Sequence, residues 1–246
     1  ATVNDYRKIP SLLSKWLQLA TGQPVVILID EYDTPIHAAW DQGYYSEIID
    51  FMRSLLSSAC KDNTHLFKAV ITGILRVAKE SIFSGMNNLG VYTIDDPIMH
   101  DSFGFTEDEV KRLLDVRDLG EDLEEVRRWY NGYRFGPERT TIYNPWSVLN
   151  YADKPSGGLR PYWVNTAKNE LIENLMTNQG REIREELDDL IHGKPVLKSI
   201  EDSVSMRDIE ARPDLIWTLL YHSGYLRCDQ TLPEETREVR TPNEEV

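Results

Sequence analysis

The sequence predicts an α/β fold that begins with a parallel sheet and continues into a helix-rich region. Residues 24–29 and 66–71 are short, continuous apolar runs rich in β-branched side chains, which is typical of buried parallel strands. An amphipathic segment at 44–60 lies between them. Because two adjacent parallel strands need a crossover connection, this strand–helix–strand order predicts a βαβ unit.

The remaining elements follow from helical periodicity and from residues that start and stop helices. Residues 5–20 have apolar side chains at helical spacing, and Gly22 is placed to end that helix. Thr106 and Glu109 form a capping-box pattern. Further helices are expected at 123–130, 145–151, 169–176, 182–191 and 213–221, and short strands at 225–228 and 237–241. We assign residues 1–100 to a partial α/β core and 101–246 to a helical region ending in a winged-helix-like helix and hairpin.

The overall composition disfavours several classes of protein. The 246 residues contain 27 Lys and Arg against 41 Asp and Glu, a net charge of −14. Such a surface repels the nucleic-acid backbone, so direct nucleic-acid binding is disfavoured. No apolar run approaches the roughly 20 residues that span a bilayer. The first residues do not resemble a signal peptide, and Cys60 and Cys228 have no metal-ligand spacing. We expect a cytoplasmic protein without a membrane segment.

Three carboxylates follow the first predicted strand directly. Asp30, Glu31 and Asp33 come after the apolar run, at the strand edge where open α/β sheets bind ligands. Residues 25–33 therefore have the pattern of a Walker B motif, in which the first acid holds Mg²⁺ and the second orients the attacking water. Since neighbouring strand residues point to opposite sides, we expect Asp30 near the metal and Glu31 near the γ-phosphate. The alternative is that these acids end the strand in a solvated turn.

Two polar residues after the second strand are further candidates for the same site. Thr72 ends that strand, where related ATPases place a polar sensor near the γ-phosphate, although a plain Thr-Gly turn has the same sequence. Arg76 follows four residues later and either stabilises transition-state charge or pairs with Glu80. The predicted site therefore contains Asp30 as the metal residue and Glu31, Thr72 and Arg76 as catalytic residues.

A nucleotide-hydrolysing site of this type also needs a glycine-rich phosphate loop, and none is found. The expected pattern is G-x-x-x-x-G-K-[S/T] ahead of a helix. Residues 85–90 contain two glycines but no following lysine, and Pro195 stands where a helix would begin after Gly193-Lys194. We therefore expect a fragment of an ATP hydrolase. Mg²⁺ and ATP would be cofactors of the complete protein, whereas this chain alone would bind neither tightly and would be inactive.

Several further segments, taken in order, resemble the predicted AAA-ATPase-like family of bacterial proteins. They are residues 28–36, 72–89, 103–110, 129–136, 142–147, 162–166, 223–226 and 242–246. The resemblance implies a P-loop NTPase-type sheet with a helix-rich lid, in which Asp30 and Glu31 match the metal and catalytic acids. Similar proteins carry their phosphate loop upstream of the point matching residue 1. They are often joined at the C-terminus to a PD-(D/E)XK nuclease domain, so the resemblance implies nucleotide and a tethered nuclease as partners.

Three functions remain open at this point. The first is an ATPase module that regulates a tethered nuclease or another effector. The second is a non-catalytic protein-interaction domain on a degenerate NTPase fold. The third treats Asp30, Glu31 and Asp33 as the metal acids of a nuclease, but no lysine stands nearby as such a site requires.

Two remaining groups of residues carry weaker predictions. Several aromatic residues in the second region either pack in its core or form a surface that stacks on bases. They are Trp129, Tyr130, Tyr133, Tyr143, Trp146, Tyr162 and Trp163. The predicted winged-helix-like unit is rich in acidic residues, which favours a structural or protein-contact role over DNA binding.

Overall fold

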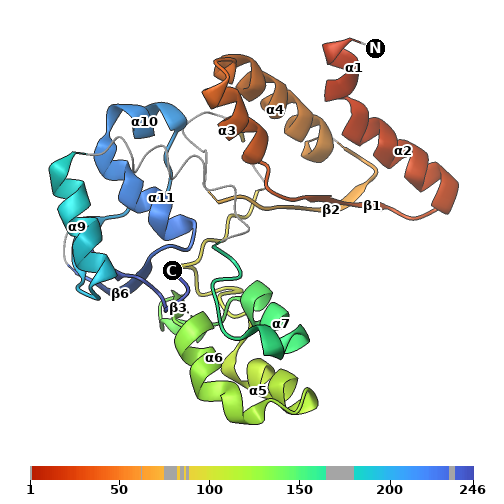
Figure 1. Ribbon diagram of the computed structural model, residues 1–246. Helices are drawn as coiled ribbons and strands as arrows, with labels where there is room; N and C mark the ends of the chain where they lie inside the picture. The colour runs from red at the N-terminus through yellow and green to blue at the C-terminus, as the bar shows by residue number, and fades with distance from the viewer. Residues whose placement is uncertain are drawn as a thin grey trace. The chain divides into compact units, whose positions relative to one another are not determined.

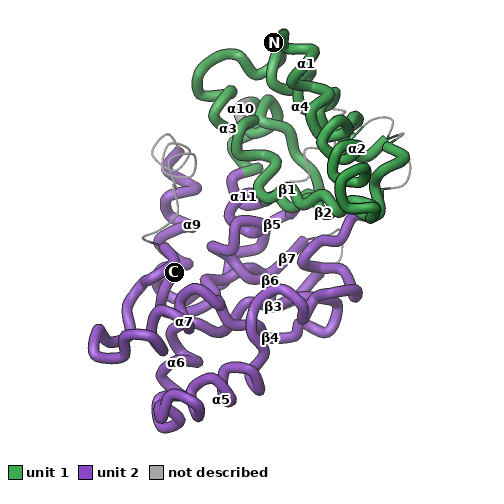
Figure 2. Tube along the Cα trace, turned by 90° about the vertical axis from the view of Figure 1, so that its right-hand side faces the viewer, with its two compact units in different colours: residues 1–90, 201–215 green, residues 91–200, 216–246 purple. Residues whose placement is uncertain are grey.

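The structure is a computed structural model that describes residues 2–61, 63–74, 82–83, 86, 89–164, 180–232 and 236–246. Within these residues the chain is a mixed α/β protein, as predicted, with one parallel and two antiparallel sheets (Figure 1). It divides into two units (Figure 2). Unit 1 comprises residues 1–90 and 201–215, and unit 2 comprises 91–200 and 216–246. No described helix is long and apolar enough to cross a membrane.

Unit 1 contains a two-stranded parallel sheet and its associated helices. Its elements are α1 (Val3–Arg7), α2 (Ile9–Thr21), β1 (Val25–Ile29), α3 (Thr34–Asp41), α4 (Tyr45–Cys60), β2 (Leu66–Ile71), α10 (Met206–Ala211) and the 3-10 turn η4 (Pro213–Leu215). β1 pairs with β2 from Val25↔Leu66 to Ile29↔Ile71. The helix α4 is the crossover between them, so the predicted βαβ unit is confirmed. Its buried face, with Ile49, Met52 and Leu56, contributes to the core of this unit.

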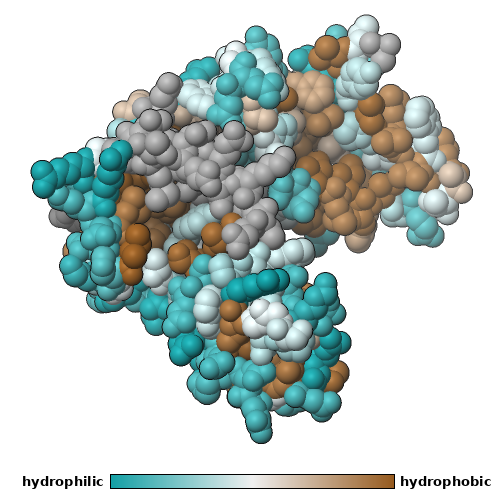
Figure 3. Space-filling view, in the orientation of Figure 1, coloured by the Kyte–Doolittle hydropathy of each residue, from teal (hydrophilic) through white to brown (hydrophobic). Residues whose placement is uncertain are grey.

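One face of the β1–β2 sheet is exposed to solvent and largely apolar, apart from Lys68, which pairs with Val26. The side chains of Leu28 and Phe67 are 75% and 73% exposed, and Val26 and Val70 are also exposed. Figure 3 shows hydrophobic residues gathered over this sheet and α2. Parallel sheets in folded proteins are ordinarily covered on both faces, because their strands are apolar on both sides. This sheet therefore presents an apolar surface that the described residues do not bury.

Unit 2 begins with a small helical core. It is formed by α5 (Glu107–Val116), α6 (Leu123–Tyr130) and α7 (Pro145–Asp153), with the 3-10 turns η2 (Gly120–Asp122) and η3 (Pro155–Gly157) beside them. The predicted capping box is present, since Glu109 Oε2 accepts hydrogen bonds from Thr106 N and Thr106 Oγ1, both at 2.9 Å. Tyr130 and Tyr143 are fully buried among the aliphatic side chains of these helices.

Two antiparallel sheets and two further helices complete unit 2. β3 (Tyr133–Phe135) pairs with β4 (Thr140–Ile142). β5 (Val196–Ser199), β7 (Thr236–Arg240) and β6 (Arg227–Thr231) form a three-stranded sheet in the order β5-β7-β6. The helices are α9 (Arg181–Ile191) and α11 (Ile216–His222).

Some elements differ from those expected. Five described elements, α3, β3, β4, β5 and α10, were not predicted, and the expected helix at 213–221 is a 3-10 turn followed by α11. The expected hairpin exists as β6–β7, but β5 adds a third strand, so the element is larger than a simple hairpin. The helix expected at 169–176 lies outside the described residues.

Candidate functional site

The predicted polar residues meet at the carboxyl ends of β1 and β2. Backbone hydrogen bonds continue the parallel pairing beyond the strands, because Thr72 N donates to Ile29 O and Tyr32 N donates to Thr72 O, both at 2.9 Å. The residues after β1 are thereby fixed against the residue that ends β2. Parallel register alone brings these two chain segments together across 41 residues of sequence.

Thr72 connects the two acids of the predicted motif. Its hydroxyl donates a hydrogen bond to Asp30 Oδ1 and accepts one from Glu31 N at 3.2 Å. Glu31 N also approaches Asp30 Oδ1 at 3.1 Å. Asp30 and Glu31 are both exposed, so their carboxylates are accessible from solvent. The structure therefore brings together three of the four predicted site residues, and the fourth, Arg76, lies outside the described residues.

The direction of Glu31 is set by a turn instead of by strand alternation. β1 ends at Ile29, and Glu31 has a φ of 48°, in the left-handed region that non-glycine residues seldom adopt. Its Oε2 accepts a hydrogen bond of 3.1 Å from Thr34 Oγ1, in the first turn of α3. We expected the two side chains to point in different directions because neighbouring residues of a strand alternate between its two sides. That reason was wrong, because neither Asp30 nor Glu31 is part of the strand. A left-handed residue held by its surroundings is a recurring feature of functional sites.

Asp33, the third acid, is a buried structural residue. It is 2% exposed, and its Oδ2 accepts a hydrogen bond of 2.8 Å from Ile74 N. Gly73 allows this close approach, because a Cβ there would lie 2.5 Å from Tyr32 Cε1 and 3.0 Å from Asp33 Oδ1. Asp33 therefore ties the β1–α3 turn to the segment after β2, and it is not available as an exposed metal ligand.

His37 lies one helical turn after Asp33 and was not identified from the sequence. Burial lowers the pKa of His37, while the negative charges of Asp33 and Asp41 oppose that decrease. Its Nε2 is buried and has no hydrogen-bond partner within the described parts of the chain. The spacing of four residues from Asp33 on a helix was the available sequence signal, but the residue had no motif around it.

The oxygen atoms of this cluster suit a hard divalent cation only in part. Asp30 offers a carboxylate and Thr72 a hydroxyl, and Mg²⁺ in proteins is often held by one or two such groups together with water and substrate phosphates. Across the described ranges there is no group of three or more His, Cys, Asp or Glu side chains placed to hold a metal ion. These ranges also contain no glycine-rich loop at a helix N-terminus that would hold phosphates.

The aromatic residues of unit 2 are divided between core and surface. Tyr130 and Tyr143 are fully buried, and their hydroxyls bind Arg160 O and Glu107 Oε2 respectively. Trp146, in contrast, is half exposed. The segment 242–246 is also integrated, since Glu245 is buried and accepts hydrogen bonds from Ser147 Oγ at 2.8 Å and from Trp163 N at 2.6 Å. Most of these motif residues therefore contribute to packing.

Comparison with known proteins gives two matches. Residues 4–83 match the model of the AAA-ATPase-like family, described as "Predicted AAA-ATPase". A protein of Azotobacter chroococcum mcd 1, described as an uncharacterized protein in the vnfD 5′ region, is 31% identical over 231 residues. The alignment covers 92% of this chain and 42% of that relative, so the chain spans less than half of the relative's length. No solved structure matches the chain.

Proposed function

We propose, from the match of residues 4–83 to the model of the AAA-ATPase-like family, that unit 1 supplies the acidic half of an ATP-hydrolysing site. The observation that carries the proposal is the Thr72–Asp30–Glu31 cluster at the carboxyl edge of a parallel sheet. This edge is where open α/β sheets bind nucleotides. A polar residue that directly follows the neighbouring strand and contacts the first acid of the motif is expected for such a site, whereas a solvated turn does not require one.

In this proposal each residue of the cluster has a separate role. Asp30 would hold Mg²⁺, and the ion would supply positive charge that offsets the charge of the phosphates of ATP. Thr72 fixes the orientation of the Asp30 carboxylate through its hydroxyl. Glu31 positions the attacking water and accepts its proton. Arg76 remains a candidate for stabilising transition-state charge.

We propose that polypeptide outside these 246 residues supplies the phosphate-binding half of the site. Without a phosphate loop, the exposed acids Asp30 and Glu31 repel a polyphosphate more than they attract it. The exposed apolar face of β1–β2 supports this part of the proposal, because additional α/β structure would bury it. We propose that such structure completes a P-loop NTPase-type sheet and contributes the glycine-rich loop. A tethered nuclease or other effector is the proposed target of regulation.

We also propose that α11 with β6 and β7 forms a winged-helix-like element with a protein-contact role. The apolar side chains Ile216, Leu219, Leu220 and Leu226 of this element are all buried. The acidic surface of the chain disfavours DNA as the ligand. Salt-sensitive binding of a labelled DNA duplex by the 246-residue chain, measured by fluorescence anisotropy, would contradict this role.

The second candidate function is a protein-interaction domain that has the fold without catalysis. The same exposed apolar face favours it, since such patches often mark contact surfaces. Calorimetric titration with Mg-ATP separates the two candidates. For the ATPase, the complete gene product should give saturable binding, whereas the 246-residue chain should give none at micromolar protein. Absence of binding by the complete gene product would favour the interaction domain. Micromolar binding by the 246-residue chain would show that the missing phosphate loop was wrongly inferred.

A further inference from the structure

Unit 2 contains a cavity that has no role in the proposed ATP hydrolysis. Its volume is about 330 Å³, and all of its lining residues belong to this unit. The lining is mainly aromatic and apolar, and the rings come from Phe103, Tyr133, Phe135, Tyr143, Trp163 and Tyr221. Small-molecule sites are typically concave, apolar and aromatic, with a few polar groups that fix the ligand, and they start near 300 Å³. The cavity therefore has the size and character of a site for a small ligand.

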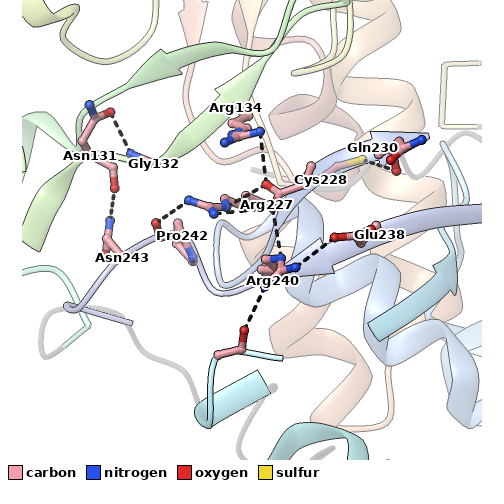
Figure 4. A network of polar contacts seen from close by, with 12 residues as sticks. Asn131, Gly132, Arg134, Arg227, Cys228, Gln230, Glu238, Arg240, Pro242 and Asn243 are labelled. Carbon is pink, nitrogen blue, oxygen red and sulfur yellow. Dashed lines mark hydrogen bonds and ion pairs between the residues drawn. The ribbon is translucent and has the colours of Figure 1, made fainter. Parts of the chain in front are cut away.

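The charged side chains that line the cavity are all positive. Arg134 and Arg227 line the cavity, and the described lining includes no carboxylate. Both arginines pair with Asp229, at 3.4 Å for Arg134 Nη1 and 2.9 Å for Arg227 Nε, and Arg240 Nε pairs with the same carboxylate at 3.1 Å (Figure 4). Arg240 also pairs with Glu238 at 3.1 Å. Within this ion-pair network three guanidinium groups share two carboxylates, and a further carboxylate, that of the buried Glu245, contacts the lining residue Trp163 through its backbone N–H.

Two buried polar atoms beside the cavity have no hydrogen bond of ordinary geometry in the described structure. They are Arg134 Nε and the hydroxyl of Tyr133, a residue that is 8% exposed. Burial raises the pKa of Tyr133 most, and the negative charge of Glu245 raises it further, while the side chains of Asn144 and Asn243 lie near the hydroxyl and oppose the rise. A ligand atom that accepts a hydrogen bond from this hydroxyl gives it a partner of good geometry.

We propose that this cavity binds a small planar aromatic compound that carries one carboxylate or phosphate group. The rings pack against the planar part of the ligand, as offset or edge-to-face pairs. Arg134 and Arg227 hold the anionic group, because guanidinium groups pair well with carboxylate and phosphate. The Tyr133 hydroxyl donates to a polar atom of the bound compound. The site lies within unit 2 and is independent of the strand-end cluster of unit 1.

Calorimetric titrations of the 246-residue chain in magnesium-free buffer test this site. The probes are indole-3-acetate for a ring with a carboxylate and adenosine monophosphate for a ring with a phosphate. Indole and acetate, each alone, are the controls for the two parts of the ligand. At least one of the two aromatic anions should bind saturably and at least about tenfold more tightly than either control, as expected for a charge-assisted contact. The tighter of the two anions identifies the anionic group.

Arg134 and Arg240 form a matched pair of variants. Both are about one-third exposed, at 33% and 32% of their side chains, and both pair with Asp229, but only Arg134 lines the cavity. Arg134→Gln should weaken binding of the better probe at least about tenfold, whereas Arg240→Gln should change it by less than about threefold. Tyr133→Phe should weaken binding severalfold without lowering the melting temperature of the free protein, since it removes a hydroxyl that has no hydrogen bond of ordinary geometry there.

Three results would overturn the proposal. One is the absence of saturable binding of either aromatic anion at millimolar concentration. Another is binding that Arg134→Gln leaves unchanged, and the third is equal weakening by Arg134→Gln and Arg240→Gln. Circular dichroism of each variant shows whether it is folded, and Tyr133→Phe provides a test that does not disturb the Asp229 ion pairs. The assay needs no ATP hydrolysis, so its outcome is separate from that of the proposed ATPase.

Discussion

The hydroxyl of Thr72 donates a hydrogen bond to the carboxylate of Asp30, and this contact joins the ends of two neighbouring parallel strands. The same hydroxyl accepts a hydrogen bond from Glu31 N. Thr72 therefore fixes the positions of both acids relative to the second strand. A threonine that only ended a strand in a turn would not need to make these two contacts.

Substitution of Thr72 tests this contact in the complete gene product. Thr72→Val keeps the shape of the side chain but removes the hydroxyl, so the Asp30 carboxylate loses its orienting partner. Residues that orient a metal ligand typically affect activity by about 10- to 100-fold, and we expect a loss of ATP turnover in that range. Thr72→Ser keeps the hydroxyl and should stay within about threefold of the parent. Equal turnover of the Val and Ser variants would show that the hydroxyl has no catalytic role.

Gly73 is predicted to be intolerant of even the smallest side chain. A Cβ at this position would lie 2.5 Å and 2.7 Å from ring carbons of Tyr32, so Gly73→Ala forces the Tyr32 ring or the turn to move. We expect a loss of about 1–3 kcal/mol in the free energy of unfolding, measured by urea denaturation. Gly157→Ala is the control, because its Cβ would meet only Tyr162 Oη at an ordinary 3.6 Å. Similar stability of the two variants would contradict the close packing seen at Gly73.

His37 should make stability depend on pH below neutrality. Its pKa is lowered from 6.5 in the folded state, chiefly by burial, so above pH 6.5 both states are neutral and there is no penalty. As the pH falls below 6.5, the unfolded chain takes up a proton first, and the free energy of unfolding decreases until the folded pKa is reached.

The variant His37→Gln isolates this contribution from the other titrating groups. When the pH is lowered from about 7.5 to about 5.5, the free energy of unfolding should decrease more for the parent than for the variant. Urea denaturation at the two pH values measures it. If the difference is the same at both, His37 has the same pKa in the folded and unfolded chains.

Local sequence signals predicted much of the fold. The β-branched runs of β1 and β2, the capping box of Thr106 and Glu109, and the amphipathic face of α4 each depend on residues close in sequence. The strands β3 and β4 have three residues each, too few for a periodic pattern. β5 is stabilised by pairing with β7, about 40 residues away, and such pairing leaves little local signal.

The site was predictable to the same extent and for the same reason. Parallel register places Thr72 beside Asp30 and Glu31, so their proximity followed from identifying two strands. The burial of Asp33 was not predictable, because it depends on a glycine at position 73 and a backbone amide at Ile74. The left-handed conformation of Glu31 likewise arises from the turn into α3, which was not expected as a helix.

The most direct test of the central claim compares Asp30→Asn with Glu31→Gln in the complete gene product. Asp30→Asn should weaken magnesium-dependent ATP binding itself, because the proposed metal residue loses its charge. Glu31→Gln keeps its shape and should still bind ATP while turnover falls by about 10² or more, because positioning of the water follows binding. Steady-state hydrolysis measured beside a binding titration separates the two effects. If Glu31→Gln hydrolyses ATP at the parent rate, this cluster is a solvated strand end and the proposed catalytic role is wrong.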